Sequence, residues 1–84
     1  MLKTGFSLQG TSLKILRSHE RGAIARIKAS DDATTHNLRK MGITPGQSIA
    51  VEQRFPRFIV RVGNNLQALD EKAINAIYVR IVEG

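Results

Sequence analysis

The sequence predicts a small, mainly β fold, a barrel of five to six short strands with one or two short helical inserts. Apolar and polar residues alternate over several short stretches, which is typical of half-buried strands. Glycine, proline and asparagine separate these stretches, as they do where strands are joined by tight turns. A chain of 84 residues has room for one core, and a small β domain avoids exposed sheet edges by curling into a barrel.

Two strands are expected in the first part of the chain. Leu13 and Ile15 alternate with polar residues over residues 12–17, which predicts a short strand. After a turn at residues 19–22, the same period of two returns over residues 22–30 and predicts a second strand. The two faces of this second strand would carry Ala23, Ala25 and Ile27 on one side and Ile24, Arg26 and Lys28 on the other.

A short helix is expected over residues 31–41. Asp31 or Asp32 can cap its first free backbone amides, and the negative charge suits the positive end of a helix. Gly42 follows at the position where many helices end in a left-handed residue, which glycine adopts without steric cost. The core-facing side chains would be Leu38 and Met41, and the outward-facing cations Arg39 and Lys40.

The stretch MGITPG connects this helix to a predicted β-hairpin. Residues 44–47 match a type II turn, because proline pre-sets the second backbone angle and Gly46 accepts the positive φ of the third position. The alternating stretches 48–55 and 58–64 then predict two strands joined at Pro56–Arg57. One face of the first strand would carry Ile49, Val51, Gln53 and Phe55, and one face of the second Phe58, Val60 and Val62. The two phenylalanines, Phe55 and Phe58, are expected to serve the core.

The last part of the chain completes the expected sheet. A turn signal at residues 63–65 precedes a third hairpin strand at residues 66–69. One helical turn is expected over residues 70–77, with Asp70 as its cap. A final strand is expected over residues 78–82.

This strand count and chain length fit an SH3-like barrel. We interpret residues 1–11 as a loosely ordered lead-in and residues 12–84 as a single domain. The chain has no cysteine, so neither a disulfide framework nor thiol chemistry is expected. Its apolar runs are far shorter than the roughly 20 residues that cross a bilayer, and we read no export signal.

Several segments, in order along the chain, carry a resemblance to a known family. They combine a Gly-x-Ile strand start, a Leu-x-x-Met-Gly-Ile helix exit, and a Pro-Gly pair before an Ile-x-Val strand. These segments, with the last helix and strand, are Gly22 to Ile27, Leu38 to Ile43, Pro45 to Val51, Ala68-Leu69 with Ala73, and Ile77 to Val79. Over roughly residues 12–82 the chain resembles the FeoA family of small SH3-like accessory proteins in bacterial ferrous iron uptake. The hairpin tip Phe55–Phe58 is shorter than the loop that the family often has there.

The resemblance implies a protein that assists FeoB, the membrane Fe(II) transporter with a cytosolic GTP-binding domain. The expected act is docking on that cytosolic part and modulating transport or GTP turnover. The resemblance also implies a cytoplasmic location, with recruitment to the inner face of the membrane through the partner. Neither DNA binding nor membrane insertion of the chain itself is expected. The sequence leaves open whether the transporter is activated or restrained, and the oligomeric state.

The charge of the chain supports a second function. Thirteen Lys and Arg against seven Asp and Glu give a formal net charge of +6, which attracts acidic partners, including nucleic acid. The alternative is therefore a basic SH3-like barrel that binds RNA or other nucleic acid. Only four residues are aromatic, whereas single-strand binders usually stack bases on aromatic platforms. The cations that could form such a wall are Arg26, Lys28, Arg54, Arg57, Arg61 and Arg80.

The sequence predicts no enzyme and no cofactor. It contains no phosphate-binding loop and no nucleophile with a base at a diagnostic spacing. His36 stands four residues after Asp32 in the predicted helix, and His19 stands beside Glu20 in a turn. A closed transition-metal site needs three or four convergent ligands, so a divalent metal is a weak alternative and no metal ligand is assigned.

The candidate partner-binding residues lie at two corners of the chain. The first is the helix exit, where cations and the turn would form a basic, partly apolar knob, and the second is the tip of the hairpin. Together these residues are Arg39, Lys40, Ile43, Thr44, Pro45, Arg54, Pro56 and Arg57. Three residues are expected to shape the first corner, of which the proline also belongs to the binding set: Gly42, Pro45 and Gly46.

Overall fold

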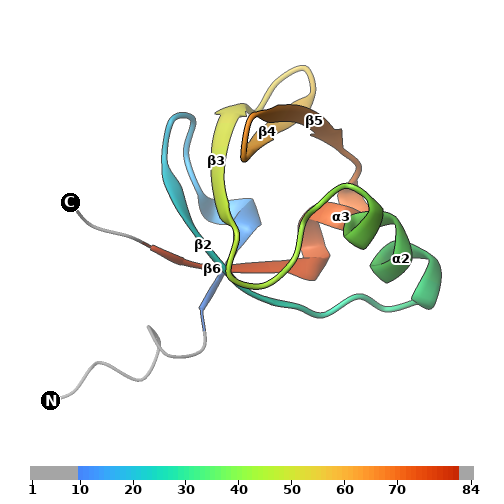
Figure 1. Ribbon diagram of the computed structural model, residues 1–84. Coiled ribbons are helices and arrows are strands. Elements are labelled where there is room, and N and C mark those ends of the chain that lie inside the picture. The colour runs from blue at the N-terminus through green and yellow to red at the C-terminus, as the bar shows by residue number, and fades with distance from the viewer. Residues whose placement is uncertain (1–9, 82–84) are drawn as a thin grey trace, which may run out of the picture.

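The computed structural model describes residues 10–81 and shows one antiparallel sheet of six strands that curls around the core (Figure 1). The strand order is β1-β6-β2-β3-β4-β5, so β1 and β5 form the two edges. The mainly β fold class is thereby confirmed. The elements are β1 (Thr11–Ser12), the 3₁₀ helix η1 (Leu13–Ile15), β2 (Arg21–Ile27), α2 (Asp32–Lys40), β3 (Ser48–Gln53), β4 (Phe58–Val62), β5 (Asn65–Leu69), α3 (Glu71–Ala76) and β6 (Ile77–Ile81).

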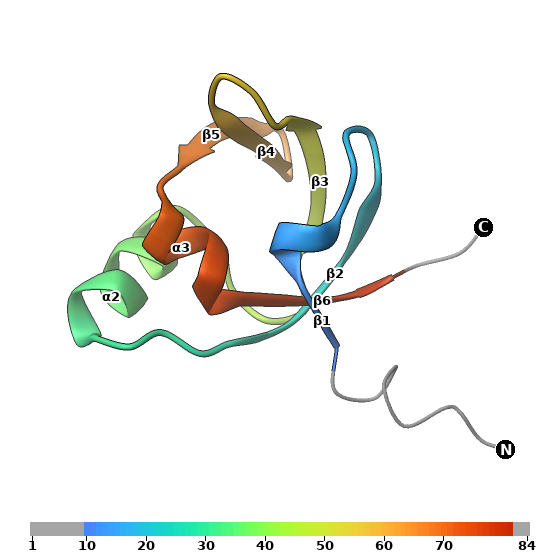
Figure 2. The same ribbon diagram turned by 180° about the vertical axis from the view of Figure 1, so that it is seen from behind.

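The gap between the two sheet edges is filled by short helices rather than by strand pairing. Helix α3 follows β5 directly and packs against η1, β5 and β6, and both views show it across the open side of the curled sheet (Figures 1 and 2). Apolar side chains from every strand except β1, together with the helices, form the core. Its buried members are Leu13, Leu16, Ile24, Leu38, Ile43, Ile49, Val51, Val60, Val62, Leu69, Ala73, Ala76, Ile77 and Val79.

The predicted strand over residues 12–17 is wrong. Only Ser12 of that range is in a strand, and the chain then turns into η1, whose first amides are capped because the Ser12 hydroxyl accepts from the Lys14 backbone N–H at 3.2 Å. The 3₁₀ geometry places residues three apart on one side. Leu13 and Leu16 are therefore buried, whereas Ile15 is 65% exposed. The first nine residues of the predicted lead-in lie outside the described residues, and Thr11 pairs with Val79.

The second predicted strand forms, but its period of two is broken. The pairing of β2 with β6 shifts register between Ile24 and Arg26, which is a β-bulge. The bulge shifts by one residue the alternation of side chains between the two faces of β2. Ile24 is consequently buried and Ile27 also packs against the core, although the sequence pattern assigns them to opposite faces.

The exit of α2 forms as predicted. Gly42 has φ +81°, its N–H donates to the Arg39 carbonyl at 3.0 Å, and the Ile43 N–H donates to the Leu38 carbonyl at 2.9 Å. These two bonds make a Schellman motif, whose apolar contact between the third-last helical residue and the residue after the glycine is supplied by Leu38 and Ile43.

The type II turn that follows is also confirmed. Gly46 has φ +96°, and the Gln47 N–H donates to the Thr44 carbonyl at 3.1 Å. Two further backbone bonds join this turn to the middle of β2: the Gly46 N–H donates to the Ile24 carbonyl and the Ile24 N–H donates to the Gln47 carbonyl, both at 2.8 Å. The turn is thus tied to the barrel wall.

The hairpin and the C-terminal elements match the prediction except at the hairpin tip. The helix α3 begins after Asp70, whose carboxylate accepts from the Ala73 N–H at 2.9 Å. Phe58 packs against the core, as expected. Phe55 does not: it is 84% exposed, because the pairing of β3 with β4 shifts register between Val51 and Gln53 and β3 then ends at Gln53.

The cap of α2 carries a charge that responds to pH. The Asp31 carboxylate accepts from the Thr34 backbone N–H at 2.7 Å, and the Lys72 ammonium lies 3.5 Å from its other oxygen. The pKa of Asp31 is lowered, chiefly by the backbone hydrogen bond from Thr34, then by the Thr34 hydroxyl and by Lys72. The charged form is therefore favoured in the folded chain.

The centre of the sheet allows no side chain at Gly22. A Cβ atom there would lie 2.5 Å from the Arg80 carbonyl oxygen of β6. We expect Gly22→Ala to lower the free energy of unfolding by about 1–3 kcal/mol, because β2 and β6 would have to separate to admit the methyl group. Urea denaturation followed by circular dichroism measures the change. A variant as stable as the wild type would show that the two strands can move apart freely.

Acid should destabilise the chain partly through Asp31. Because the folded pKa lies below the value of 3.8 that Asp31 would otherwise have, the stabilisation is present above that pH and is lost as the pH falls through the folded pKa. In Asp31→Asn, the asparagine caps a helix equally well but does not titrate. We expect the variant to lose less stability than the wild type between roughly pH 5 and pH 2, measured by urea denaturation at each pH. Parallel pH profiles would contradict this assignment.

Candidate functional site

Two adjacent grooves flank the turn between β5 and α3. We call them the α2 groove, with a volume of about 310 Å³, and the hairpin groove, with a volume of about 760 Å³. They share the last two residues of β5, Ala68 and Leu69, and Asp70 in the turn. The two corners that the sequence singles out, the helix exit and the hairpin tip, therefore border one continuous surface.

The α2 groove lies between helix α2 and the end of β5. Its floor is apolar, because Leu38 of α2 meets Leu69 and Ala73 from the other side. The side chain of Gln67 fixes the end of the helix against β5, donating from Nε2 to the Met41 carbonyl at 2.6 Å. The remaining lining residues from α2 are Thr34, Asn37 and Lys40. Among the described lining residues Lys40 is the one cation, at the end of the helix where a positive charge is favourable.

The hairpin groove has an apolar floor and a charged rim of both signs. Phe55 and Pro56 at the hairpin tip are exposed, and Phe58 and Ile74 are half-buried beneath them. The rim residues with charged side chains are Lys14, Arg54 and Arg57 on one side and Asp70 and Glu71 on the other. Of the exposed large apolar side chains in the described part of the chain, Phe55 is the one that lines a groove.

Arg54 has a role that the sequence does not reveal. Its guanidinium donates to the backbone carbonyls of Lys14, at 3.0 Å, and Leu16, and it lies over the Phe58 ring at 5.6 Å from the centroid. These bonds connect the end of β3 with the segment around η1. The sequence predicts Arg54 to be a free cation for a partner, and its contacts are instead within the fold.

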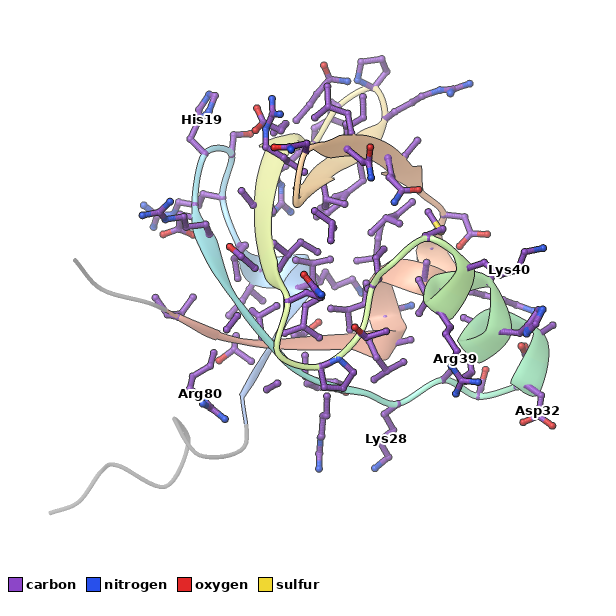
Figure 3. All side chains as sticks on the ribbon, in the orientation of Figure 1. His19, Lys28, Asp32, Arg39, Lys40 and Arg80 are labelled. Carbon is purple, nitrogen blue, oxygen red and sulfur yellow. The ribbon has the colours of Figure 1, made fainter. Side chains whose placement is uncertain are left out.

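The other predicted contact residues are placed as follows. Ile43, predicted on the exposed knob, is 1% exposed, because the Schellman motif turns it into the core. Thr44 is half-buried. The exposed members of the set are Arg39, Lys40, Pro45, Pro56 and Arg57. Figure 3 shows Lys40 pointing away from the barrel at the end of α2, with Arg39 on the side of the helix nearer Lys28.

Half of the cations of the predicted nucleic-acid wall contact neighbours within the chain. Arg61 pairs with Glu52, with 2.9 Å between Nε and Oε2, and Arg26 lies over the ring of its cross-strand neighbour Tyr78 at 5.5 Å from the centroid. With Arg54, three of the six cations that could form a nucleic-acid wall contact neighbours in the fold. The wall expected for that alternative function is therefore weakened.

The histidines and carboxylates do not gather. Within residues 10–81 no three His, Asp, Glu or Cys side chains are placed to hold one metal ion. His19 lies in the turn before β2 and Asp32 at the start of α2, at opposite ends of the molecule in Figure 3. Over the same residues, no helix has the length and apolar character needed to span a membrane.

The residues of this surface that the sequence does not predict are mostly apolar. Phe55, Ile74 and Ala68 line the surface, but each looks like an ordinary core position of a strand or helix. The available signal was the position of Phe55 directly before Pro56 in a short turn, since turns lie at the surface of a protein. This signal concerns Phe55 only.

A family model and a curated relative indicate the same family. The FeoA domain family model matches residues 11–81. A protein of Leptolyngbya boryana named "Putative Fe(2+) transport protein A" is 47% identical over 79 residues, which cover 93% of this chain and 96% of the relative.

Two solved structures show the same fold. The crystal structure of an Iron Uptake Regulatory Protein (FeoA) matches with a TM-score of 0.76 at 24% identity, covering 86% of this chain and 96% of the other. The zinc complex of Stenotrophomonas maltophilia FeoA, described as a prokaryotic SH3 domain protein, matches with a TM-score of 0.71 at 22% identity, covering 80% of this chain and 86% of the other. The predicted SH3-like barrel is confirmed.

The different roles of the two arginines at the hairpin tip can be separated by matched variants. Arg54→Gln removes the bonds to the η1 segment and should lower the free energy of unfolding by about 1–2 kcal/mol. Arg57→Gln removes the same charge from an exposed side chain and should change it by less than about 0.5 kcal/mol. Urea denaturation of both variants checks this. Equal stabilities would mean that the Arg54 bonds contribute nothing.

Proposed function

Because the chain belongs to the FeoA family of ferrous iron transport proteins, we propose that it is a non-enzymatic accessory protein that docks on the cytosolic part of a FeoB-type Fe(II) transporter. Docking modulates transport or the transporter's GTP turnover. The chain works in the cytoplasm and reaches the inner face of the membrane through this partner. The hydrolysis of GTP belongs to the partner.

The exposure of Phe55 is the observation that supports this proposal most. A phenylalanine that is 84% exposed at a hairpin tip adds nothing to the core, and full burial of such a side chain is worth about 1.5–3 kcal/mol. It stands beside a groove whose floor includes Phe58 and Ile74. Aromatic side chains of this kind are the usual anchors of protein–protein interfaces.

The charges around the surface favour an acidic partner. Lys40 borders the α2 groove and Arg57 the hairpin groove, and both are exposed. The formal net charge of +6 adds a long-range attraction to a negatively charged protein face. Charges at the rim of an interface act mainly on the association rate and on the choice of partner, while the buried anchor holds the complex together.

The contacts within the fold favour protein docking over nucleic-acid binding. Arg26, Arg54 and Arg61 contact Tyr78, backbone carbonyls and Glu52, respectively, within the same chain. In nucleic-acid binding, several Lys and Arg side chains neutralise phosphates and displace the counterions of the nucleic acid. This makes the affinity steeply dependent on salt. The salt dependence of binding therefore distinguishes the two functions.

Phe55→Ser should weaken binding to the cytosolic GTP-binding domain of the cognate transporter by about tenfold or more, because the apolar anchor is lost. The fold should be unchanged, since the side chain makes little contact with the core. The matched control is Ile81→Ser, which removes another exposed apolar side chain, 47% exposed, at the end of β6 and outside both grooves. Calorimetry at two salt concentrations measures the affinities.

Three results would count against the proposal. The first is a wild-type chain that does not bind the domain, and the second is an equal loss of affinity in the two variants. The third is recovery of RNA from cell extract in preference to the transporter, with binding that disappears at high salt, which would establish the alternative function.

A further inference from the structure

The turn between β4 and β5 determines which backbone groups of β5 point outward. Val62 and Asn65 are paired across a two-residue loop whose first residue, Gly63, has φ +61°. In such a loop the flanking residues form a hydrogen-bonded pair, and hydrogen-bonded and non-hydrogen-bonded pairs then alternate along an antiparallel ladder. The hydrogen-bonded pairs are accordingly Val62–Asn65, Val60–Gln67 and Phe58–Leu69.

The two remaining residues of β5 therefore direct their backbone groups away from β4. These are Leu66 and Ala68, opposite Arg61 and Ile59. Since β5 is an edge of the sheet, within residues 10–81 no second strand pairs with it, and no loop or turn there bonds to the backbone of Leu66 or Ala68. Leu66 is 58% exposed and Ala68 is also exposed. Two N–H donors and two C=O acceptors thus face outward in a row.

This edge lacks the features by which proteins usually protect a free strand. The sequence of β5, NLQAL, contains no charge and no proline, and its pairing with β4 runs without a bulge. The other edge, β1, has only two residues. Of the two edges in the described part of the chain, β5 is therefore the one long enough for pairing.

The α2 groove begins where this edge ends. Ala68 and Leu69 of β5 line one side and α2 lines the other, and β5 runs toward the side of the molecule that carries α2 and α3 (Figure 1). A strand edge next to a helix, with an apolar groove between them, is the arrangement by which some domains bind an extended peptide as an added strand. Backbone bonds then give affinity, and the groove selects the side chains.

We propose that the β5 edge and the α2 groove bind an extended acidic segment of the partner by β-strand addition. This inference rests on the proposed function and specifies its binding mode. The segment pairs with Leu66 and Ala68, places an apolar side chain over Leu38 and Ala73, and directs a carboxylate to Lys40.

The charges and the shape of the site favour this occupant. Lys40 is the cation of the groove, while the Asp70 carboxylate on the other wall already accepts from the Ala73 N–H. A second copy of the chain would bring the same net charge of +6, and its β5 would arrive with its own α2 alongside. A segment that is not part of a sheet fits between β5 and α2 without that obstacle.

Amide hydrogen exchange tests the inference directly. The ¹⁵N-labelled chain is followed by NMR with and without the purified cytosolic domain of the cognate transporter. We expect exchange at the Leu66 and Ala68 amides to slow by about tenfold or more on binding, because each gains a hydrogen bond. The amides of Asn65, Gln67 and Leu69 already face β4 and serve as internal controls.

Variants of Ala68 add a second measurement. Ala68→Pro removes an outward N–H, and an edge strand accepts proline where the N–H faces solvent. We expect affinity for the transporter domain to fall by about tenfold, whereas Ala68→Ser, which keeps the N–H, should bind as the wild type does. NMR spectra verify the fold of both variants, and the exchange experiment decides the question if the proline variant does not fold.

The charge is tested by Lys40→Glu against Arg80→Glu. Both replace one exposed cation, and Figure 3 shows Arg80 on β6, on the side of the molecule away from Lys40. We expect the first variant to bind the transporter domain several-fold more weakly than the second at low salt. Equal affinities would contradict the inference that the bound segment is acidic.

The outcomes separate the inference from the proposed function. Binding of the transporter domain without protection at Leu66 and Ala68 overturns strand addition and leaves the proposed function in place. Absence of binding overturns both. Protection that grows with the concentration of the chain alone identifies a second copy as the occupant and overturns the acidic segment.

Discussion

The exit of α2 is the constraint on which the arrangement of the candidate site depends. The Schellman motif buries Ile43 beside Leu38, and the type II turn that follows is bonded through Gly46 and Gln47 to Ile24 in the middle of β2. A helix of nine residues would not be stable alone in water. These bonds hold its C-terminal end against the barrel, and Gln67 holds the same end against β5. The position of the α2 groove therefore follows from these backbone bonds together with the one side-chain bond from Gln67.

The curled sheet of this chain has an open edge. Gly22 lets β2 approach β6 closely, and the bulge after Ile24 bends β2 further. The sheet nevertheless does not close, because β1 has two residues and α3 occupies the space between the edges. A sheet that ends against a helix leaves its edge strands with unpaired backbone groups, and the longer edge strand has more of them. In the described part of this chain that strand is β5, beside the grooves.

The sequence was informative where the backbone conformation depends on one residue type. Gly42, Gly46 and Asp70 are local signals that predict their conformations correctly, because glycine is favoured after a helix and in a type II turn, and a carboxylate before a helix. Of the two candidate caps of α2, Asp31 and Asp32, the first is the cap. The strand predicted around Leu13 failed because alternation over six residues also fits a 3₁₀ turn with its buried residues three apart. Register shifts such as the bulge in β2 depend on the partner strand, which a local pattern does not contain.

The candidate site was harder to predict because tertiary contacts decide whether a charged or apolar side chain is available to a partner. Arg54 and Arg57 look alike in the sequence, yet the first bonds to carbonyls that are 38 and 40 positions away, and the second is exposed. Phe55 and Phe58 likewise look alike, yet of the two it is Phe58 that packs against the core. The fold thus uses one member of each pair and leaves the other on the surface. The surface therefore combines an exposed apolar side chain, the charge of Lys40 and the outward backbone groups of Leu66 and Ala68. These features match the apolar side chains, the carboxylates and the backbone of an extended acidic protein segment.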